Sequence, residues 1–298
     1  MKNNNNNNKA FNLKDDYFYQ QWREQKLTDY PTNITDLLVN VNMPHKMDKD
    51  EKQQILTRVK KANMAIYVSD IKDSDINIPL QTSAQFGLKN INSNWLAQNK
   101  GVSSLQVEKN RTNQHYIPYT NKAINWHTDG YYNALDKQIY ALNLHCVSPA
   151  FKGGKNKLLD HEIAYILLRD ENPDYIKALS DKNAMTIPAR EKPNGKIARK
   201  TITGPVFSVN DDGFLHMRHT IRKKFIHYAD DNLTCEAVQF LNHILQDESN
   251  KYIFYGKLEA GMGLISHNIL HTRDGFEDSE NQKRLIYRTR FFDRIDIF

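Results

Sequence analysis

The sequence has few of the features that would place the protein in an oxidising compartment or a membrane. It contains only two cysteines, Cys146 and Cys235, and no CxxC spacing. This composition argues against a disulfide framework and is typical of a reducing cytoplasm. No apolar run approaches the ~20 residues that span a bilayer, and the N-terminus lacks the apolar core of a secretory signal. We therefore expect a cytoplasmic protein without a membrane partner.

Long blocks of one charge are also missing. The chain has 41 Lys and Arg residues against 35 Asp and Glu residues, for a net charge of +6. The basic residues are spread along the sequence, with local concentrations at residues 190–200 and 218–224. This distribution argues against a nucleic-acid partner and suits a small anionic substrate or cosubstrate.

The organisation of the chain predicts a short tail followed by one domain. Six consecutive Asn residues follow the first two residues, so we expect residues 1–8 to be disordered. A hydrophobic content of 39% and a charged content of 26% are typical of a globular protein. No composition shift marks a boundary between residues 9 and 298, so we expect a single domain there.

Apolar periodicity predicts a mainly β protein with helical insertions. Helices are expected over residues 49–61, 80–86, 161–168 and 232–246, with one or two more over residues 13–38. Strands are expected over residues 65–68, 104–107, 117–119, 140–147, 214–218, 262–265 and 284–292. The Pro193-Asn194-Gly195 segment predicts a hairpin. Strands from both ends of the chain enclose the helices, which suits a double-layered β-barrel flanked by helices.

A candidate metal site begins at the sequence Trp126-His127-Thr128-Asp129-Gly130. On a strand, His127 and Asp129 project to the same side because strand side chains alternate with period 2. One distant histidine, His271, would complete a set of two imidazoles and one carboxylate. That set holds non-haem Fe(II) on one face and leaves the other positions open. An HxD triplet alone is also common on protein surfaces, so the downstream motif decides the interpretation.

Downstream of His271, arginines alternate with other residues over 284–290. On a strand, Arg284, Arg288 and Arg290 share one face. A buried guanidinium is costly unless it meets an anion, and its planar fork suits a carboxylate. A dicarboxylate cosubstrate would satisfy this need. The alternative is an outer, solvated face, or pairing with nearby Asp and Glu.

The order HxD, long gap, HxR and arginine strand resembles the Fe(II)/2-oxoglutarate dioxygenases of the taurine dioxygenase and clavaminate synthase type. Several other segments carry the same resemblance, from about residue 60 to the end: Ala65–Val68, Gln85–Gly87, Ser148-Pro149 with Gly153-Gly154, and His267–Phe276. The combined pattern is specific, although each part alone is not. The resemblance implies a double-stranded β-helix, or jelly-roll, core.

The resemblance implies that His127, Asp129 and His271 are the catalytic iron ligands. Fe(II), 2-oxoglutarate and O2 would be required, and succinate and CO2 would be released as a substrate is hydroxylated. Related halogenases have no carboxylate at the position of Asp129, so the aspartate favours a hydroxylase or a hydroxylase-like outcome such as desaturation or ring closure.

Three further residues are implied for 2-oxoglutarate. Arg288 would pair with its distal carboxylate, and Arg284 would support that site. Asn156 stands where the family commonly has Thr, and its amide can still donate a hydrogen bond.

The substrate site is less well specified by the sequence. Tyr131, Tyr132 and Asn133 directly follow the metal motif and are candidates for the mouth of the pocket. Arg218 is a candidate for an anionic substrate group, and a solvated basic segment is the alternative. His216 and His219 have the i, i+3 spacing of a second metal site on a helix, but no third ligand is evident nearby.

Three functions are therefore compared. The leading hypothesis is an Fe(II)- and 2-oxoglutarate-dependent oxygenase acting on a small polar or anionic metabolite. A nucleic-acid dealkylase of the same chemistry is suggested by the spacing of Arg284 and Arg290, but such enzymes hold HxD and the distal His closer in sequence. A non-catalytic metal- or ligand-binding barrel is the third, and the complete ligand set argues against it. The substrate, the oxidised carbon and the presence of a homo-oligomer are left open.

Overall fold

The computed structural model describes residues 9–93, 101–107, 116–191, 195–222 and 226–296. The predicted Asn-rich tail over residues 1–8 lies outside these ranges. The chain divides into two compact units, which are described separately. Unit 1 comprises Met1–Tyr30, Trp126–Gln138 and Leu159–Tyr252; unit 2 comprises Pro31–Asn125, Ile139–Leu158 and Ile253–Phe298.

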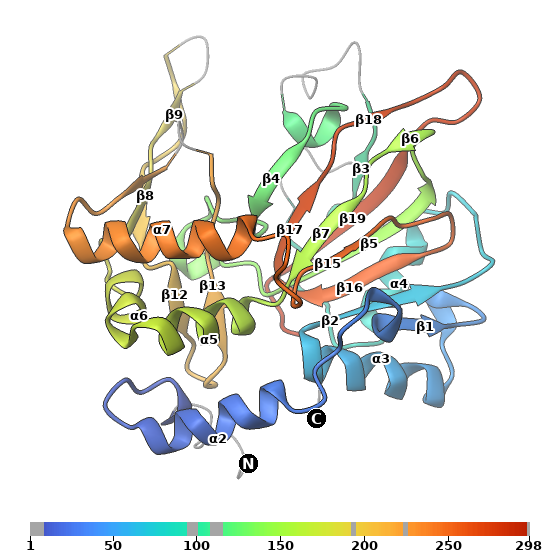
Figure 1. Cartoon of the computed structure of the whole chain (residues 1–298). Coiled ribbons are helices and arrows are strands. Elements are labelled where there is room, and N and C mark those ends of the chain that lie inside the picture. Colours follow the sequence, from blue (N-terminus) through green and yellow to red (C-terminus); the bar gives the residue numbers. More distant parts are fainter. Residues whose placement is uncertain (1–8, 94–100, 108–115, 192–194, 223–225, 297–298) are drawn as a thin grey trace. The chain divides into compact units, whose positions relative to one another are not determined.

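The largest element of unit 2 is a six-stranded sheet with the order β1-β2-β16-β5-β19-β3 (Figure 1). Its strands are β1 (Leu38–Asn40), β2 (Met64–Val68), β16 (Gly263–His267), β5 (Ala141–Ser148), β19 (Leu285–Phe291) and β3 (Ser103–Leu105). β1 pairs with β2 in parallel, and the other neighbours are antiparallel. Strands from both ends of the chain therefore meet in one sheet, as the sequence predicts.

One face of this sheet packs against helices α3 (Lys49–Ala62) and α4 (Asn77–Ala84). α3 begins at a capping box in which the side chains of Asp48 and Glu51 each accept from the other's backbone N–H. Alternate strand residues, among them Tyr67, Ile265 and Phe291, join the helix residues in a buried apolar core. Because side chains alternate along a strand, the intervening residues project to the opposite face.

A second sheet has four strands in the order β15-β7-β17-β4. They are β15 (Phe254–Gly256), β7 (Asn156–Leu159), β17 (Leu270–Arg273) and β4 (Ile124–His127). Nearby, β6 (Lys152–Gly153) pairs with β18 (Phe276–Glu277). Gly153 has a φ of +73°, and a Cβ there would lie 2.4 Å from the Gly275 carbonyl oxygen. Only glycine fits this close approach, which accounts for the first residue of the Gly153-Gly154 pair.

Unit 1 contains the helices α2 (Asp16–Leu27), α5 (His161–Glu171), α6 (Pro173–Leu179) and α7 (Asn232–Gln246). Its short sheets are β11-β8-β14, β10-β9 and β12-β13, built from β8 (Met185–Ile187), β9 (Arg190–Glu191), β10 (Ile197–Arg199), β11 (Ile202–Gly204), β12 (Phe207–Val209), β13 (Leu215–Met217) and β14 (His227–Tyr228). α7 has the bounds that its apolar stripe predicts, and Ala237, Leu241 and Ile244 on that stripe are buried.

Two elements differ from the prediction. The expected strand over residues 117–119 is a 3-10 turn, η5 (Ile117–Tyr119), because Pro118 fixes a turn geometry at its start. The helix expected over residues 80–86 begins earlier, at Asn77, and Gly87 follows it with a φ of +80°. The remaining 3-10 turns are η1 (Ile34–Leu37), η2 (Pro44–Lys46) and η6 (Leu135–Lys137).

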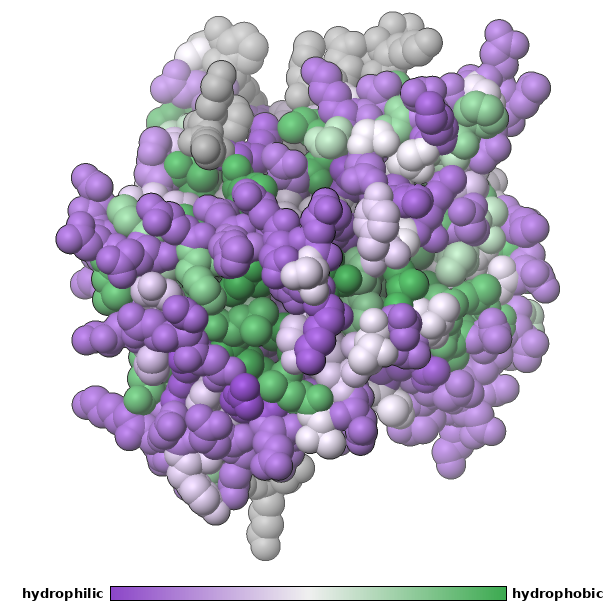
Figure 2. Space-filling model, in the orientation of Figure 1, coloured by the Kyte–Doolittle hydropathy of each residue, from purple (hydrophilic) through white to green (hydrophobic). Residues whose placement is uncertain are grey.

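The face of the molecule in Figure 2 is mostly hydrophilic, with apolar residues in groups between polar ones. Within the described ranges, no helix has both the length and the apolar character needed to cross a membrane. β9 and β10 pair as the two arms of the predicted hairpin, whereas residues 193–194 of the predicted turn segment lie outside the described residues.

Candidate metal centre

The first metal motif lies at the end of β4, where several contacts fix its backbone. The buried indole of Trp126 donates from Nε1 to the Leu245 carbonyl at 2.8 Å, which ties the strand to the end of α7. Directly after Asp129, Gly130 has a φ of +68°, and the Asn133 N–H donates to its carbonyl at 2.8 Å. The glycine lets the chain turn sharply behind the aspartate.

The residue between the two predicted ligands, Thr128, pairs with a second segment of unit 1. Its N–H donates to the His219 carbonyl at 3.0 Å, and the His219 N–H donates to the Thr128 hydroxyl at 3.1 Å. His127 and Thr220 form an adjacent antiparallel bridge. The segment after β13 therefore pairs with the HxD backbone and holds it in position.

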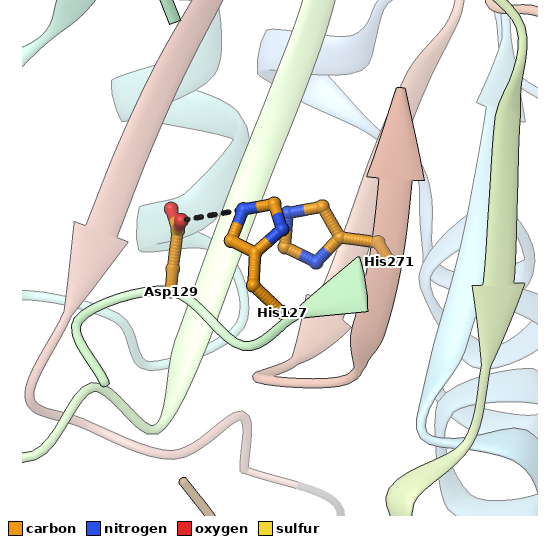
Figure 3. Close-up of side chains that lie close together, drawn as sticks. All are labelled: His127, Asp129 and His271. Carbon is orange, nitrogen blue, oxygen red and sulfur yellow. Dashed lines mark ion pairs between the residues drawn. The ribbon is translucent and has the colours of Figure 1, made fainter. Parts of the chain in front are cut away.

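The three predicted ligands come together. One donor atom each from His127, Asp129 and His271 lies within 4.8 Å of the other two, and Figure 3 shows the side chains converging. His127 Nε2 is 3.6 Å from Asp129 Oδ1. Ligands around one metal with bonds of ~2.0–2.2 Å lie roughly 3–4 Å apart, so this spacing fits a metal ion.

The proton position on His271 also suits a metal. Its Nδ1 lies 3.1 Å from the Ile269 carbonyl oxygen. A carbonyl only accepts, so Nδ1 carries the proton and Nε2 presents its lone pair. Asp129 and His271 are buried, with 4% and 7% of their surfaces exposed. A neutral imidazole pair with one carboxylate matches the donor set for non-haem Fe(II).

Unit 2 contains a cavity next to His271. It is lined by Ile34, Ile66, Leu144, Asn156, Leu158, Gly256, Lys257, Leu258, Leu264 and His271. Four residues lie opposite one another in neighbouring strands of the six-stranded sheet, namely Ile66, Leu264, Leu144 and Arg288. Residues directly opposite in a sheet project to the same face. Arg288 therefore shares the cavity face with the three lining residues of its row.

Three buried guanidiniums gather in unit 2. Burial, together with the charges of Arg284 and Arg288, lowers the pKa of Arg273 to about 9. Burial also lowers the pKa of Arg284 to about 10. Arg273 donates to four backbone carbonyls, those of Ile117, Pro118, Thr120 and Lys122. Arg273 thus fastens the segment that leads into β4, while the group as a whole favours an anion nearby.

The comparison with known families decides the identity of this fold. Residues 39–290, most of the chain, match the family model described as taurine catabolism dioxygenase TauD, TfdA family. The chain belongs to the TauD, TfdA family. Dioxygenases of this family depend on Fe(II), 2-oxoglutarate and O2, so the predicted family resemblance and cofactors are confirmed.

Two relatives by sequence are uridine-5'-phosphate dioxygenases. The one from Amycolatopsis sp is 29% identical over 185 residues, covering 56% of this chain and 60% of that protein. The one from Streptomyces sp is 29% identical over 189 residues, covering 61% and 66%. The chain thus spans less than two thirds of the length of these relatives.

Solved structures of TauD-like oxygenases share the fold. Asparagine oxygenase in complex with Fe(II), 2S,3S-3-hydroxyasparagine and succinate has a TM-score of 0.58 at 12% identity, covering 81% of this chain and 79% of that chain. A taurine dioxygenase from Burkholderia xenovorans has a TM-score of 0.55 at 17% identity, covering 86% and 87%. These likenesses establish a sheet-rich fold with helices.

The TauD-like chain places the residues predicted for 2-oxoglutarate in different settings. Asn156 lines the cavity, and its amide Nδ2 donates to the Thr272 carbonyl at 2.6 Å. Arg284 is buried over the Phe276 ring, 5.2 Å from its centroid, and NH1 donates to the Leu105 carbonyl at 3.4 Å. The predicted alternative of a solvated arginine face is wrong, because Arg284, Arg288 and Arg290 are all buried.

The three residues after the metal motif form a local group. The rings of Tyr131 and Tyr132 make an edge-to-face contact at 5.1 Å, and the Arg199 guanidinium lies 5.6 Å from the Tyr132 ring centroid. The Asn133 amide donates to the Lys137 carbonyl at 2.9 Å. Asn133 therefore closes the turn, whereas the two tyrosines are half-buried beside the motif.

The environment of Arg218 is the clearest departure from the sequence prediction. Only 1% of its surface is exposed, so the alternative of a solvated basic segment is wrong. His216 and His219 do not form the helical pair considered from their spacing, because His216 lies on strand β13 and pairs with Ser208. The contact between His219 and the HxD motif could not be predicted from local sequence, because that pairing joins segments about 90 residues apart.

Proposed function

We propose that the protein is an Fe(II)- and 2-oxoglutarate-dependent oxygenase in which His127, Asp129 and His271 hold the metal. The observation that carries this proposal is the convergence of their donor atoms within 4.8 Å. The Fe(II) ion, when bound, supplies O2 activation coupled to the oxidative decarboxylation of 2-oxoglutarate to succinate and CO2. Membership of the TauD, TfdA family supports the same chemistry.

Arg288 is proposed to bind the distal carboxylate of 2-oxoglutarate. It lies on the cavity face of β19, in the same cross-strand row as Leu144, and the cavity also contacts His271. The planar guanidinium can make two charge-assisted hydrogen bonds to a carboxylate. Asn156 offers its amide oxygen and nitrogen at the cavity wall, and Arg284 adds positive charge near Arg288. These residues would orient the cosubstrate and balance its charge.

The two sheets and the cavity wall support a jelly-roll arrangement. The cavity is lined by Ile66, Leu144 and Leu264 of the six-stranded sheet and by Asn156 and His271 of the four-stranded sheet. A jelly roll places two such sheets face to face around a core. We extend this arrangement to one TauD-like domain over residues 9–298. The cytoplasmic location and the possibility of a homo-oligomer stay predictions.

The substrate is proposed to be a small polar anion, and a nucleoside 5'-phosphate is the first candidate. Support comes from the two relatives named uridine-5'-phosphate dioxygenase. The dispersed basic residues, which form no extended block, favour a small molecule over nucleic acid. A carboxylate at the position of Asp129 favours hydroxylation of that substrate.

Succinate formation from 2-oxoglutarate tests the proposal. The full chain is incubated under air with Fe(II) and 2-oxoglutarate, with and without uridine-5'-monophosphate, and succinate is quantified. We expect Fe(II)-dependent succinate that increases when the nucleotide is added, and none from His271→Ala. Absence of succinate from the wild-type chain with and without nucleotide, although the protein is folded, would reject the proposed function.

A further inference from the structure

Arg218 is a buried cation that the fold does not neutralise. Its NH2 group donates to the carbonyls of Met185 at 2.9 Å and Gly204 at 2.8 Å. Nε and NH1 are buried without a hydrogen-bond partner. Among the described residues, no carboxylate forms an ion pair with this side chain. An uncompensated buried guanidinium is expensive, since each unmet donor loses its hydration.

The neighbouring residue, His219, offers a second unused donor. Its surface is fully buried, and Nδ1 lies 3.2 Å from the Tyr228 hydroxyl. Nε2 is buried without a hydrogen-bond partner. When the hydroxyl donates to Nδ1, the proton of the neutral imidazole lies on Nε2. The pair then presents an N–H donor whose orientation the tyrosine fixes.

Both donors belong to the segment whose backbone pairs with the metal motif. The backbone of His219 pairs with Thr128, the residue between the proposed ligands. His127 forms a backbone bridge to Thr220, the residue that follows His219, so the two histidines lie on adjacent segments. The Tyr228 hydroxyl contacts His219, and Tyr228 lies near enough to Arg218 to affect the pKa of its guanidinium. A group bound beside the metal ligands would therefore be near all three side chains.

We propose that Arg218, His219 and Tyr228 form a subsite for the phosphate of a phosphate-monoester substrate. Arg218 supplies the positive charge and NH1 and Nε donors, and His219 supplies one neutral N–H donor. Tyr228 is a positioning residue that fixes the imidazole. A phosphate monoester matches this set because it carries about two negative charges and several acceptor oxygens. The inference rests on the proposed function and names the substrate group that the site recognises.

The subsite provides a hydrogen-bond partner for these buried donors. If this position served stability alone, we would expect either a carboxylate next to Arg218 or an apolar side chain of similar length in its place. Both side chains are buried, so their donors are accessible only to a ligand that is itself enclosed. A substrate oriented beside the metal ligands meets that condition, whereas a solvent anion does not.

The test compares uridine-5'-monophosphate with uridine, which lacks only the phosphate. Ligand binding to the full chain is measured by thermal stabilisation, and succinate formation with 2-oxoglutarate alone is measured in parallel. The variants are Arg218→Met, Arg218→Lys, His219→Phe, His219→Gln and Tyr228→Phe. His216→Gln is the matched control, because His216 is a buried histidine on the adjacent strand β13.

We expect the wild-type chain to bind the nucleotide at least about tenfold more tightly than uridine, because the phosphate adds charge-assisted hydrogen bonds. Arg218→Met and His219→Phe should remove most of this preference, and His219→Gln, which keeps a donor, should restore part of it. Succinate formation without nucleotide should stay at the wild-type level in the control His216→Gln.

Two results would overturn the subsite. One is equal binding of the nucleotide and uridine by a wild-type chain that still forms succinate, which leaves the proposed function intact. The other is that His219→Phe and Tyr228→Phe keep the wild-type preference for the nucleotide over uridine. If Arg218→Met is folded, it should be measured in the same way, and an unchanged preference there would count against the subsite too. Failure of the wild-type chain to form any succinate would instead reject the proposed function, independently of the binding comparison.

Discussion

Two of the buried cations in unit 1, Lys26 and Arg218, have different surroundings. Lys26 is 6% exposed, and its Nζ lies 2.7 Å from Asp160 Oδ2 and 2.6 Å from Glu162 Oε2. Burial lowers the pKa of Lys26, but the charges of Asp160 and Glu162 outweigh it and raise the pKa. Arg218 is 1% exposed and meets only two carbonyls, and burial lowers its pKa to about 10.

The comparison distinguishes buried polar groups that are paired within the fold from those whose partner would be a bound ligand. Lys26 connects α2 to the start of α5, where Asp160 is the N-cap, so its charge is matched within the fold. Arg218 is buried equally well but has two donor atoms without a hydrogen-bond partner, and the next residue, His219, pairs with the HxD motif. Buried polar groups near the HxD motif are therefore expected to affect ligand binding more than folding, and those near Lys26 the reverse.

The largest expected effect belongs to the metal ligands. His127→Ala, Asp129→Ala or His271→Ala should lower 2-oxoglutarate turnover on the order of 10³-fold or more, since metal-assisted chemistry contributes several kcal/mol. Thermal unfolding should change little, because each side chain serves the metal. A large drop in the melting temperature with turnover per folded molecule retained would place these residues among the structural groups.

Asp160→Asn should have the next largest effect, and on stability. It leaves Lys26 paired with Glu162 alone, and breaking a buried ion pair costs up to ~3–5 kcal/mol. Urea unfolding of Asp160→Asn measures this loss, and the double variant Lys26→Met/Asp160→Asn is the matched control because it removes both charges of the pair instead of leaving one of them buried alone. Equal destabilisation by the two variants would show that charge matching is not what stabilises this site.

Arg288→Ala should chiefly raise the concentration of 2-oxoglutarate required for half-maximal succinate formation, by roughly 10- to 100-fold, for the loss of a charge-assisted pair worth ~1.5–3 kcal/mol. Arg288→Lys should retain part of the affinity because it keeps the charge but loses the fork. An unchanged requirement in Arg288→Ala would move the anchoring role to Arg284.

The smallest expected effect is a loss of stability at low pH, caused by His145, which is neutral when buried in the folded protein. His145 is fully buried in unit 2, with Nδ1 3.0 Å from the Tyr67 hydroxyl, and burial lowers its pKa to about 4. Its folded pKa lies below the unfolded value, so stability is complete above about pH 6.5 and falls as the pH approaches 4.

Between pH 7 and pH 5, His145 takes up a proton in the unfolded chain but stays neutral in the folded protein. We therefore expect the free energy of unfolding to fall by about 1–2 kcal/mol over this interval. Urea unfolding at the two pH values measures the loss. His145→Gln, which does not titrate, should lose less over the same interval. A loss of the same size in His145→Gln would assign the pH dependence to other groups.

Much of the fold could be predicted because apolar periodicity reports burial. The α7 stripe and the alternating residues of β19 gave accurate bounds, since each exposes one face to a core. Short strands without a clear pattern, such as β7 and β15, were not predicted, and Pro118 turned an apolar run into η5. α6 was also not predicted, although Asn172 caps it and Pro173 opens it.

The candidate site divides in the same way. The metal residues were predicted because a chemical set at family spacing is visible in sequence. The hydrogen bonds of Arg273 and Arg218 were not, because both depend on backbone carbonyls supplied by distant segments, although Arg218 was predicted as a candidate for an anionic substrate group. Burial of a charged side chain without an acidic partner is a property of the folded chain, and local sequence does not encode it.

The central claim is that His127, Asp129 and His271 form one Fe(II) centre that also admits 2-oxoglutarate. An anaerobic titration of Fe(II) into the full chain with 2-oxoglutarate, followed by visible charge-transfer absorption, tests it most directly. We predict a band that saturates at one Fe(II) per chain and is absent in His271→Ala. The claim is contradicted if the wild-type chain gives no band, or if His271→Ala gives the same band at the same stoichiometry.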